Sequence, residues 1–263
     1  VDGDDDLDLL VNSCGDGTRL FLNSGRGRFE ESRKSGLQRN SGSTSLALAD
    51  IDGDGDLDLY VANYRSRTIR STGFPTLNIR GRRVLPPEYK DWLEILPNGQ
   101  VLEHGEPDVL YLNNGRGFFT PVSWTNGSFL DASGAAMQKP PRDWGLSAIF
   151  YDFTDDGAPD LHVCNDFHSP DRAWINNGNG TFSEASPLAI RNTPTFSMAA
   201  DFADINRDGH VDFIAADMLE PSTSARLRQA SGAEGSAPGI ITRRAQFERN
   251  TLQLGRGDGT FEE

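Results

Sequence analysis

Aspartate residues recur in four short clusters, and their spacing is suited to holding a cation. The most complete cluster runs from Asp50 to Asp58 and has carboxylates at its first, third, fifth and ninth positions. Gly55 stands at the sixth position, where a sharp turn lets the chain wrap around an ion. The backbone carbonyl of Asp56 is a further oxygen at the seventh position. Hard oxygen ligands of this number and flexibility are typical of calcium sites.

Electrostatics favour the same ion. Two carboxylates ~5 Å apart repel each other by about 3 kcal/mol at an effective dielectric constant of about 20. Four of them in one loop would be strongly unfavourable without a cation, and a merely solvated acidic turn would not explain why the spacing recurs. The sequence has no clustered His and Cys ligands of the kind that zinc and copper prefer. We therefore predict Ca²⁺ as the ion.

The four predicted calcium loops differ in completeness. The second is complete, and in the fourth Asn206 still offers a carbonyl oxygen. In the third, Thr154 replaces an acidic ligand and Pro159 stiffens the exit, while the first lacks the residue before Val1 and is expected to bind weakly. Residues at the seventh position, such as His210, need only their backbone carbonyl. The candidate ligands are Asp2, Asp4, Asp6 and Asp8; Asp50, Asp52, Asp54, Asp56 and Asp58; Asp152, Thr154, Asp156, Ala158 and Asp160; and Asp204, Asn206, Asp208, His210 and Asp212.

Each aspartate loop belongs to a longer repeat that closes with a glycine turn. Leu112–Phe119 and Ile175–Phe182 show this turn, in which Asn and Gly are followed by Phe. Gly and Asn supply the positive φ angles that tight hairpins require. Short β-rich runs flank both features, so each unit reads as strand, aspartate loop, strand, connection, strand, glycine turn, strand. A four-stranded unit repeated along a chain predicts an all-β protein of the β-propeller type.

The repeats predict one propeller domain over residues 1–263, made of four blade-like units with two insertions. Both insertions are far longer than ordinary hairpin loops. They are either decoration on one rim or a surface that binds a partner, since loops on rigid scaffolds often carry recognition. The units span residues 1–32, 44–123, 146–186 and 197–263, and the insertions span residues 64–107 and 218–249.

These motifs resemble a known repeat family. The aspartate loops followed by Leu57–Val61, together with the glycine turns, resemble FG-GAP/VCBS repeats of the integrin α-subunit propeller type. Asn165–Phe167, Ser197–Phe202 and Arg249–Leu252 narrow the resemblance to bacterial relatives of cartilage acidic protein, the ASPIC/UnbV group. The resemblance implies a secreted or cell-surface propeller, often seven-bladed, with calcium in the blade loops. The four units would then be an arc of a larger ring.

Composition limits the remaining possibilities. The net charge of −14 disfavours nucleic acid and anionic membrane surfaces as partners, since both would be repelled. No stretch approaches the ~20 apolar residues that span a bilayer. Two cysteines, Cys14 and Cys164, are too few for a disulfide framework. No GxSxG, P-loop or HExxH motif occurs, so we expect no enzymatic activity.

The sequence therefore favours a calcium-binding extracellular or cell-surface scaffold for adhesion or protein interaction. One alternative is an extracellular propeller that binds or helps to process polysaccharide through its insertions. Another is a structural repeat region of a larger enzyme or export protein. The expected partners are calcium and an extracellular protein or glycan. Fold alone does not decide between these functions, because propellers host many of them.

Overall fold

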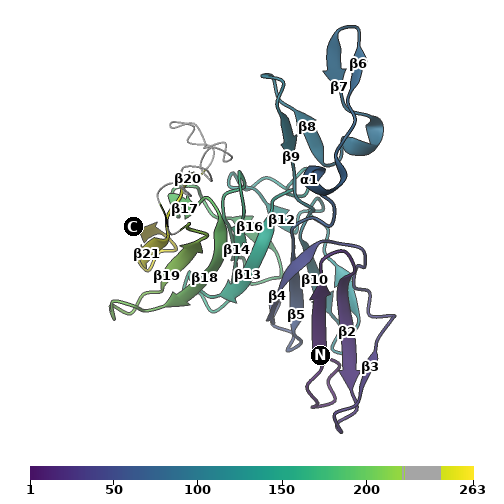
Figure 1. Ribbon diagram of the computed structural model, residues 1–263. Helices are drawn as coiled ribbons and strands as arrows, with labels where there is room; N and C mark the ends of the chain where they lie inside the picture. The colour runs from purple at the N-terminus through teal and green to yellow at the C-terminus, as the bar shows by residue number, and fades with distance from the viewer. Residues whose placement is uncertain (221, 223–243) are drawn as a thin grey trace.

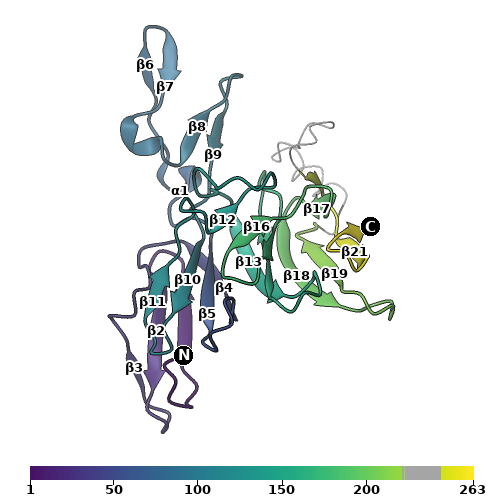
Figure 2. The same ribbon diagram turned by 180° about the vertical axis from the view of Figure 1, so that it is seen from behind.

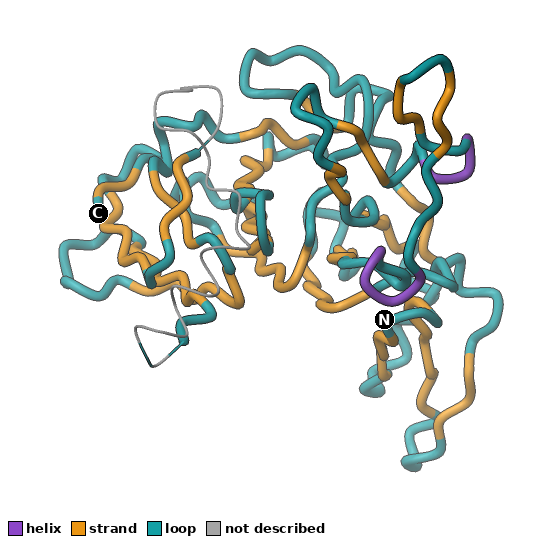
Figure 3. Tube along the Cα trace, turned by 45° about the horizontal axis from the view of Figure 1, so that its top comes forward, coloured by secondary structure: helices purple, strands orange, loops and turns teal. Residues whose placement is uncertain are grey.

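The structure, a computed structural model, describes residues 1–220, 222 and 244–263. The described regular structure consists almost wholly of strands, and its helical segments are the short turns α1 (Ile69–Thr72) and η1 (Pro87–Tyr89). Figure 3 shows strands and loops along the whole described chain. The prediction of an all-β protein is confirmed.

Four main sheets follow one another along the chain, one for each predicted unit. The strands of each unit pair antiparallel with their neighbours in sequence order. The first sheet contains β1 (Leu9–Ser13), β2 (Gly17–Asn23) and β3 (Phe29–Glu31). The second contains β4 (Ser43–Ala49), β5 (Asp58–Asn63), β10 (Val109–Asn113) and β11 (Phe119–Pro121). The third contains β13 (Gly145–Tyr151), β14 (Asp160–Asn165), β15 (Arg172–Asn176) and β16 (Phe182–Glu184). The fourth contains β18 (Ser197–Ala203), β19 (Asp212–Asp217), β21 (Thr251–Gly255) and β22 (Phe261–Glu262).

One strand of the third sheet lies outside the repeat pattern. β12 (Phe129–Leu130) pairs in parallel with β16 at the sheet's edge. It comes from the segment between the second and third units, for which the sequence predicts no strand. Phe129 is fully buried beside Trp124 and Trp174, so burial of its aromatic side chain holds this segment against the edge.

The sheets stack face to face in a row (Figures 1 and 2). β13 lies against β4 on one side and against β18 on the other. The first and fourth sheets stand at the two ends of the row, and no described strand of one pairs with a strand of the other.

Stacking explains why the second strand of each middle sheet has no polar face. All residues of β5 and β14 are buried. In β5, Leu59 and Val61 enter the apolar core shared with the first sheet. Tyr60 and Ala62 point the opposite way, into the core shared with the third sheet. Successive side chains of a strand face opposite sides of its sheet, so a strand buried on both faces reads as a continuous apolar run.

The outer sheets bury one face and expose the other. Leu9 and Val11 of β1 are exposed at one end of the row, 47% and 38% respectively. At the other end Ile214 and Leu252, a directly opposed pair on β19 and β21, are 45% and 42% exposed. Each end of the row therefore presents apolar side chains to solvent.

The insertion at residues 64–107 is structured. It contains the hairpin β6 (Leu77–Ile79) with β7 (Arg82–Val84), and the hairpin β8 (Leu93–Ile95) with β9 (Val101–Glu103). Both hairpins project beyond the sheets, as Figures 1 and 2 show.

The insertion at residues 218–249 lies mostly outside the described residues. Its last part forms β20 (Ala245–Phe247), which pairs in parallel with β17 (Asn192–Pro194). Among the described residues, no helix has the length and apolar character needed to cross a membrane.

We predict that this chain self-associates through its exposed end faces, because the opposed pair Ile214 and Leu252 would bury apolar surface on contact. Native mass spectrometry and small-angle scattering over a concentration series should show oligomers, and the double variant Ile214→Thr with Leu252→Thr should shift them toward monomer. Leu77→Thr, at a similarly exposed apolar residue of β6, is the matched control. A wild-type chain that stays monomeric at every concentration would contradict the prediction.

Candidate metal sites in the aspartate loops

The second aspartate loop brings three carboxylates together. Oxygen atoms of Asp50, Asp52 and Asp58 all lie within 4.8 Å of one another. Asp50 accepts hydrogen bonds from the backbone N–H groups of Gly53 at 2.8 Å and Gly55 at 3.0 Å. These bonds wrap the loop around its first carboxylate and leave the three side chains facing a common point.

The ninth-position aspartate ties each loop to its own sheet. Asp58 is only 1% exposed. Its Oδ2 accepts the N–H of Ile51 at 3.2 Å within the loop, and its Oδ1 accepts the N–H of Asn113 at 2.8 Å at the end of β10. Asp160 and Asp212 repeat both contacts in the third and fourth units. The loop is thus fixed against the third strand of its unit.

The first loop holds a second group of three carboxylates, formed by Asp2, Asp4 and Asp8. Asp8 accepts the N–H of Asn23 at 2.8 Å and forms an ion pair with the N-terminal amino group of Val1 at 2.7 Å. Burial raises the pKa of Asp8, but the bonds from these two donors outweigh it, and the pKa lies below its usual value.

The third and fourth loops have similar backbones but fewer acidic groups. At the third position, Thr154 donates its hydroxyl to Asp160 at 3.0 Å, and Asn206 donates its side-chain amide to Asp208 at 2.8 Å. Neither loop gathers three carboxylates in the described structure. The expectation that Thr154 and Pro159 make the third loop a poorer site than the second remains a prediction.

Burial and crowding raise the pKa of two carboxylates of the second loop. At Asp58 burial is the largest cause, and with smaller repulsion from Asp52 and Asp54 it raises the pKa to about 6 against the hydrogen bonds from Asn113 and Ile51. Burial also raises the pKa of Asp52, with Asp54 and Asp50 adding repulsion. A cation at the loop would relieve this repulsion.

Not every candidate ligand points toward the group of three. The carboxylate of Asp54 accepts the N–H of Asp56 at 2.9 Å and is not part of the group. The Asp56 side chain lies against Gly115, the first glycine of the same unit's glycine turn, and the His210 ring lies against Gly257 in the equivalent turn. The seventh position thus packs its side chain on the turn, which leaves its backbone carbonyl as the atom that could bind an ion.

The first and second loops also contact the next unit. The side-chain amide of Asn176 in the third unit donates to the carbonyl of Ile51 in the second loop at 2.9 Å. Gly180, at φ +72°, lies close to the same loop, and a Cβ there would meet that of Asp52 at 3.3 Å. Asn113 makes the equivalent bond to Val1 of the first loop. In the sequence these asparagines look like ordinary turn residues, and their recurrence as Asn23, Asn113 and Asn176 in three of the four units is the signal that marks them.

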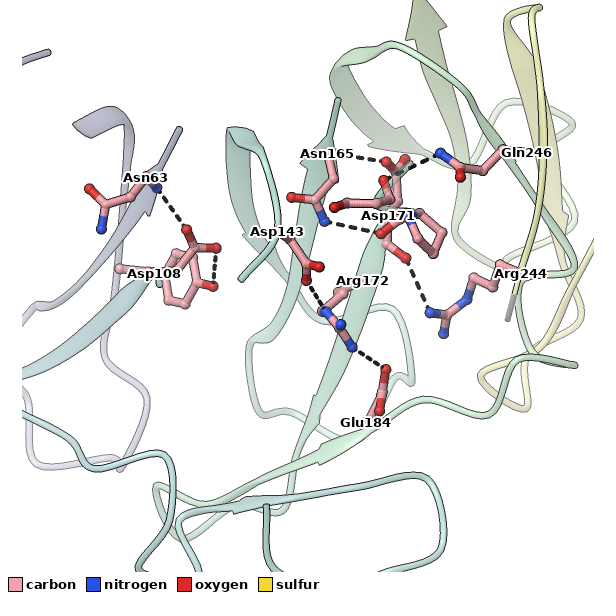
Figure 4. Close-up of polar contacts among 12 residues, drawn as sticks. Asn63, Asp108, Asp143, Asn165, Asp171, Arg172, Glu184, Arg244 and Gln246 are labelled. Carbon is pink, nitrogen blue, oxygen red and sulfur yellow. Dashed lines mark hydrogen bonds and ion pairs between the residues drawn. The ribbon is translucent and has the colours of Figure 1, made fainter. Parts of the chain in front are cut away.

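A second polar cluster recurs at the opposite end of the sheets (Figure 4). Asp108 accepts the N–H of Asn63 at 2.7 Å and the hydroxyl of Tyr60 at 2.8 Å. In the next unit Asp171 accepts the N–H of Asn165 at 2.9 Å. Burial raises the pKa of Asp108 to about 7, although its hydrogen bonds oppose the shift.

An aromatic pocket of about 390 Å³ lies beside this end of the third sheet. Its wall includes Tyr64, Trp144 and Phe167, whose ring centroids are 4.7, 5.3 and 6.2 Å apart in pairs. Phe167 is 39% exposed and has a φ of +56°, a conformation that costs a non-glycine residue on the order of 1–3 kcal/mol. Thr68 and Glu103 add polar groups to the lining.

Comparison with known proteins finds one repeat family that matches parts of the chain. The sequence profile described as "FG-GAP-like repeat" matches residues 1–61 and 152–215. No curated protein matches the chain. Two similar solved structures are a lectin of Agrocybe aegerita, described by its recognition of non-reducing terminal N-acetylglucosamine, and the Tc holotoxin pore of Photorhabdus luminescens. Both are 17% identical and cover 97% of this chain, with TM-scores of 0.33 and 0.28. The chain spans 64% of the lectin and 12% of the toxin chain, less than two thirds of either.

We predict that Asp108→Asn removes part of the pH dependence of stability. The folded pKa of about 7 exceeds the ~3.9 of an unfolded aspartate, so wild type should lose stability as pH rises from about 4 to 7. The amide cannot ionise; its carbonyl oxygen still accepts the N–H of Asn63, and its NH2 group can donate to the Tyr60 oxygen in place of the carboxylate oxygen that accepts from it. Urea unfolding at several pH values should show the variant gaining more than about 1 kcal/mol on wild type across this window. Parallel pH profiles would contradict the assignment.

Proposed function

We propose that this FG-GAP repeat protein is a calcium-binding propeller segment that acts outside the cell, or on its surface, as a non-catalytic scaffold for adhesion or protein interaction. The observation that carries the proposal is the convergence of three carboxylates in each of two aspartate loops. The extracellular setting and the adhesive role rest on the resemblance of the repeats to integrin-type propellers.

The donor set of the second loop suits calcium. Asp50, Asp52 and Asp58 would hold the ion, with the backbone carbonyl of Asp56 as a further oxygen. All are hard oxygen donors, and the loop wraps through glycine at its sixth position, which matches the flexible coordination that calcium accepts. Calcium would supply charge neutralisation there and no redox chemistry. In the first loop Asp2, Asp4 and Asp8 would serve in the same way.

Calcium would act on the stacking of the units as well as on the loop. Ile51 accepts a hydrogen bond from Asn176 of the next unit while its own N–H is bonded to Asp58. An ion held by Asp58 would therefore stiffen a segment that two neighbouring units share. We propose that calcium keeps the row of sheets rigid and so presents its surfaces in fixed positions.

Packing supports the propeller arrangement. The middle sheets are four-stranded meanders, apart from the added β12, and both of their faces are buried by neighbouring sheets. This is the arrangement of consecutive propeller blades. The hairpins of residues 64–107 project at the end of the sheets opposite the aspartate loops, where a partner could reach them without disturbing the metal sites.

A second candidate function is glycan binding, and the aromatic pocket favours it. Sugar rings stack their C–H faces on exposed aromatic rings, and Phe167 is exposed at the pocket while Trp144 and Tyr64 support it. Thr68 and Glu103 could bond to hydroxyl groups. The backbone strain at Phe167 is consistent with a position maintained for function.

We predict that calcium stabilises the chain by mass action, because it should bind the folded loops and not the unfolded chain. The melting temperature should rise from chelator to calcium, by the equivalent of about 2.7 kcal/mol when free calcium is 100 times its Kd. Magnesium should substitute poorly, since it demands tighter octahedral geometry.

Asp52→Asn tests the second loop, and its fold should be retained because Asn206 occupies the equivalent position in the fourth loop. The variant should bind calcium more weakly at one site by calorimetry, because a charged ligand becomes a neutral one, and be no less stable than wild type in chelator. Asp91→Asn, which removes an equal charge outside the loops, should behave as wild type. A calcium-independent melting temperature, or an unchanged affinity of every site in Asp52→Asn, would refute the calcium proposal.

The glycan alternative predicts that Phe167→Gly abolishes binding on a glycan array while the chain stays folded, because glycine accepts the positive φ and the lost packing is limited to one ring edge of the pocket. Phe118→Ala, at another exposed aromatic, is the control and should leave binding unchanged. If wild type binds no glycan, or if Phe167→Gly binds as wild type does, the pocket is not a glycan site.

A further inference from the structure

Two consecutive units place different chemistry at equivalent positions. Tyr60 and Ala62 of β5 correspond to His162 and Cys164 of β14, because both strands follow the ninth aspartate of their loops. Asp108, just before β10, likewise corresponds to Asp171, just before β15. In the second unit this arrangement is a simple hydrogen bond from the Tyr60 hydroxyl to Asp108. In the third unit the same three positions hold His162, Cys164 and Asp171, and each of these side chains can bind a metal ion.

The three side chains converge in the interior. His162, Cys164 and Asp171 are each 1% exposed, and their ligand atoms lie within 4.8 Å of one another. The Nε2 atom of His162 is 3.5 Å from Oδ2 of Asp171. Two ligands at about 2.0–2.1 Å from one tetrahedral zinc ion are separated by about 3.4 Å, so this spacing suits a shared ion.

His162 gives independent evidence for a ligand. Neither of its ring nitrogens has a hydrogen-bond partner, although the residue is almost fully buried. Its ring packs beside Phe202 and Phe213 of the fourth unit, with centroid distances of 5.7 and 5.2 Å. Leaving a buried polar group without a partner costs roughly 1–3 kcal/mol. The Tyr60 hydroxyl in the second unit has no such deficit.

We propose that His162, Cys164 and Asp171 bind a divalent transition-metal ion, with zinc as the best match. A nitrogen, a thiolate sulfur and a carboxylate oxygen form a ligand set that zinc accepts, whereas calcium and magnesium prefer oxygen alone. A divalent ion with one thiolate and one carboxylate is electrically neutral, which limits the cost of burying it. This site is separate from the aspartate loops, and the proposal does not depend on the calcium proposal.

Neighbouring groups hold Asp171 in position. Its Oδ1 accepts the N–H of Asn165 at 2.9 Å, and its Oδ2 accepts the hydroxyl of Ser197 at 2.8 Å. Its backbone carbonyl accepts the guanidinium of Arg244 at 3.1 Å (Figure 4). Hydrogen bonds of this kind orient carboxylate ligands.

The ion would fasten β14 to the start of β15. His162 and Cys164 lie on β14, while Asp171 ends the connection over residues 166–171. A shared ion would close this connection, which carries Phe167 and borders the fourth sheet. The ion would then have a structural role and stabilise the connection between the two strands, as structural zinc sites do in other folds.

Cobalt is the probe that tests the site, because thiolate-bound tetrahedral Co²⁺ absorbs in the near ultraviolet and the visible. The whole chain, saturated with calcium to occupy the aspartate loops, is titrated with Co²⁺ when folded and also refolded in its presence. We expect one equivalent with a sulfur-to-cobalt charge-transfer band, displaced by Zn²⁺.

The substitutions introduce the residues found at the equivalent positions of the second unit. Cys164→Ala corresponds to Ala62, so this variant should fold and lose the charge-transfer band. Its zinc affinity should fall by more than the roughly 10- to 100-fold that loss of an outer-shell partner costs. His162→Tyr should weaken zinc similarly. Cys14→Ala, at the exposed cysteine of the first unit, should keep both band and affinity.

Two results would overturn the proposal. One is the absence of a thiolate band after both loading procedures. The other is a band that persists in Cys164→Ala and disappears in Cys14→Ala. In either case His162 and Asp171 would be no more than a buried polar pair.

Discussion

The buried aspartate at the ninth position of each loop is the contact on which the rest of the structure depends. One of its oxygens closes the loop in the second, third and fourth units, and the other holds the backbone at the end of the third strand. Asp58 does this through Ile51 and Asn113, and Asp160 through Phe153 and Asn176. A buried carboxylate without such donors would be costly, so the aspartate and its strand partners specify one geometry together.

The same contact links the units into a row. The asparagine that donates its backbone N–H to the ninth aspartate also donates its side-chain amide to the preceding unit's loop, as Asn113 and Asn176 do. Apolar packing then covers the faces, with Tyr60 and Ala62 on one side of β5 and Leu59 on the other. The same asparagines thus take part both in the geometry of the loop and in the stacking of the units. A substitution there would disturb both.

The two ends of the sheets differ in how their buried and clustered carboxylates are stabilised. At one end, acidic groups crowd around loops and are suited to a cation. At the other, single buried carboxylates such as Asp108 and Asp171 are satisfied by neutral donors. Nearby, Arg172 pairs with both Asp143 and Glu184. Much of the negative charge behind the net value of −14 is therefore concentrated in the aspartate loops. A cation bound there would reduce the electrostatic repulsion most.

The sequence by itself determined the all-β class, the four repeats, the strand order of each unit and the positions of the aspartate loops, because these follow from local spacing and turn chemistry. It could not decide which acidic residues converge. Asp50, Asp52 and Asp58 meet whereas Asp54 bonds within the loop, and only the folded loop sets those directions. It also gave no sign that Asn176 reaches Ile51 or that Asp171 meets His162 and Cys164. The first contact joins two units and depends on how their sheets stack, whereas the second lies within one unit and depends on the pairing of β14 with β15.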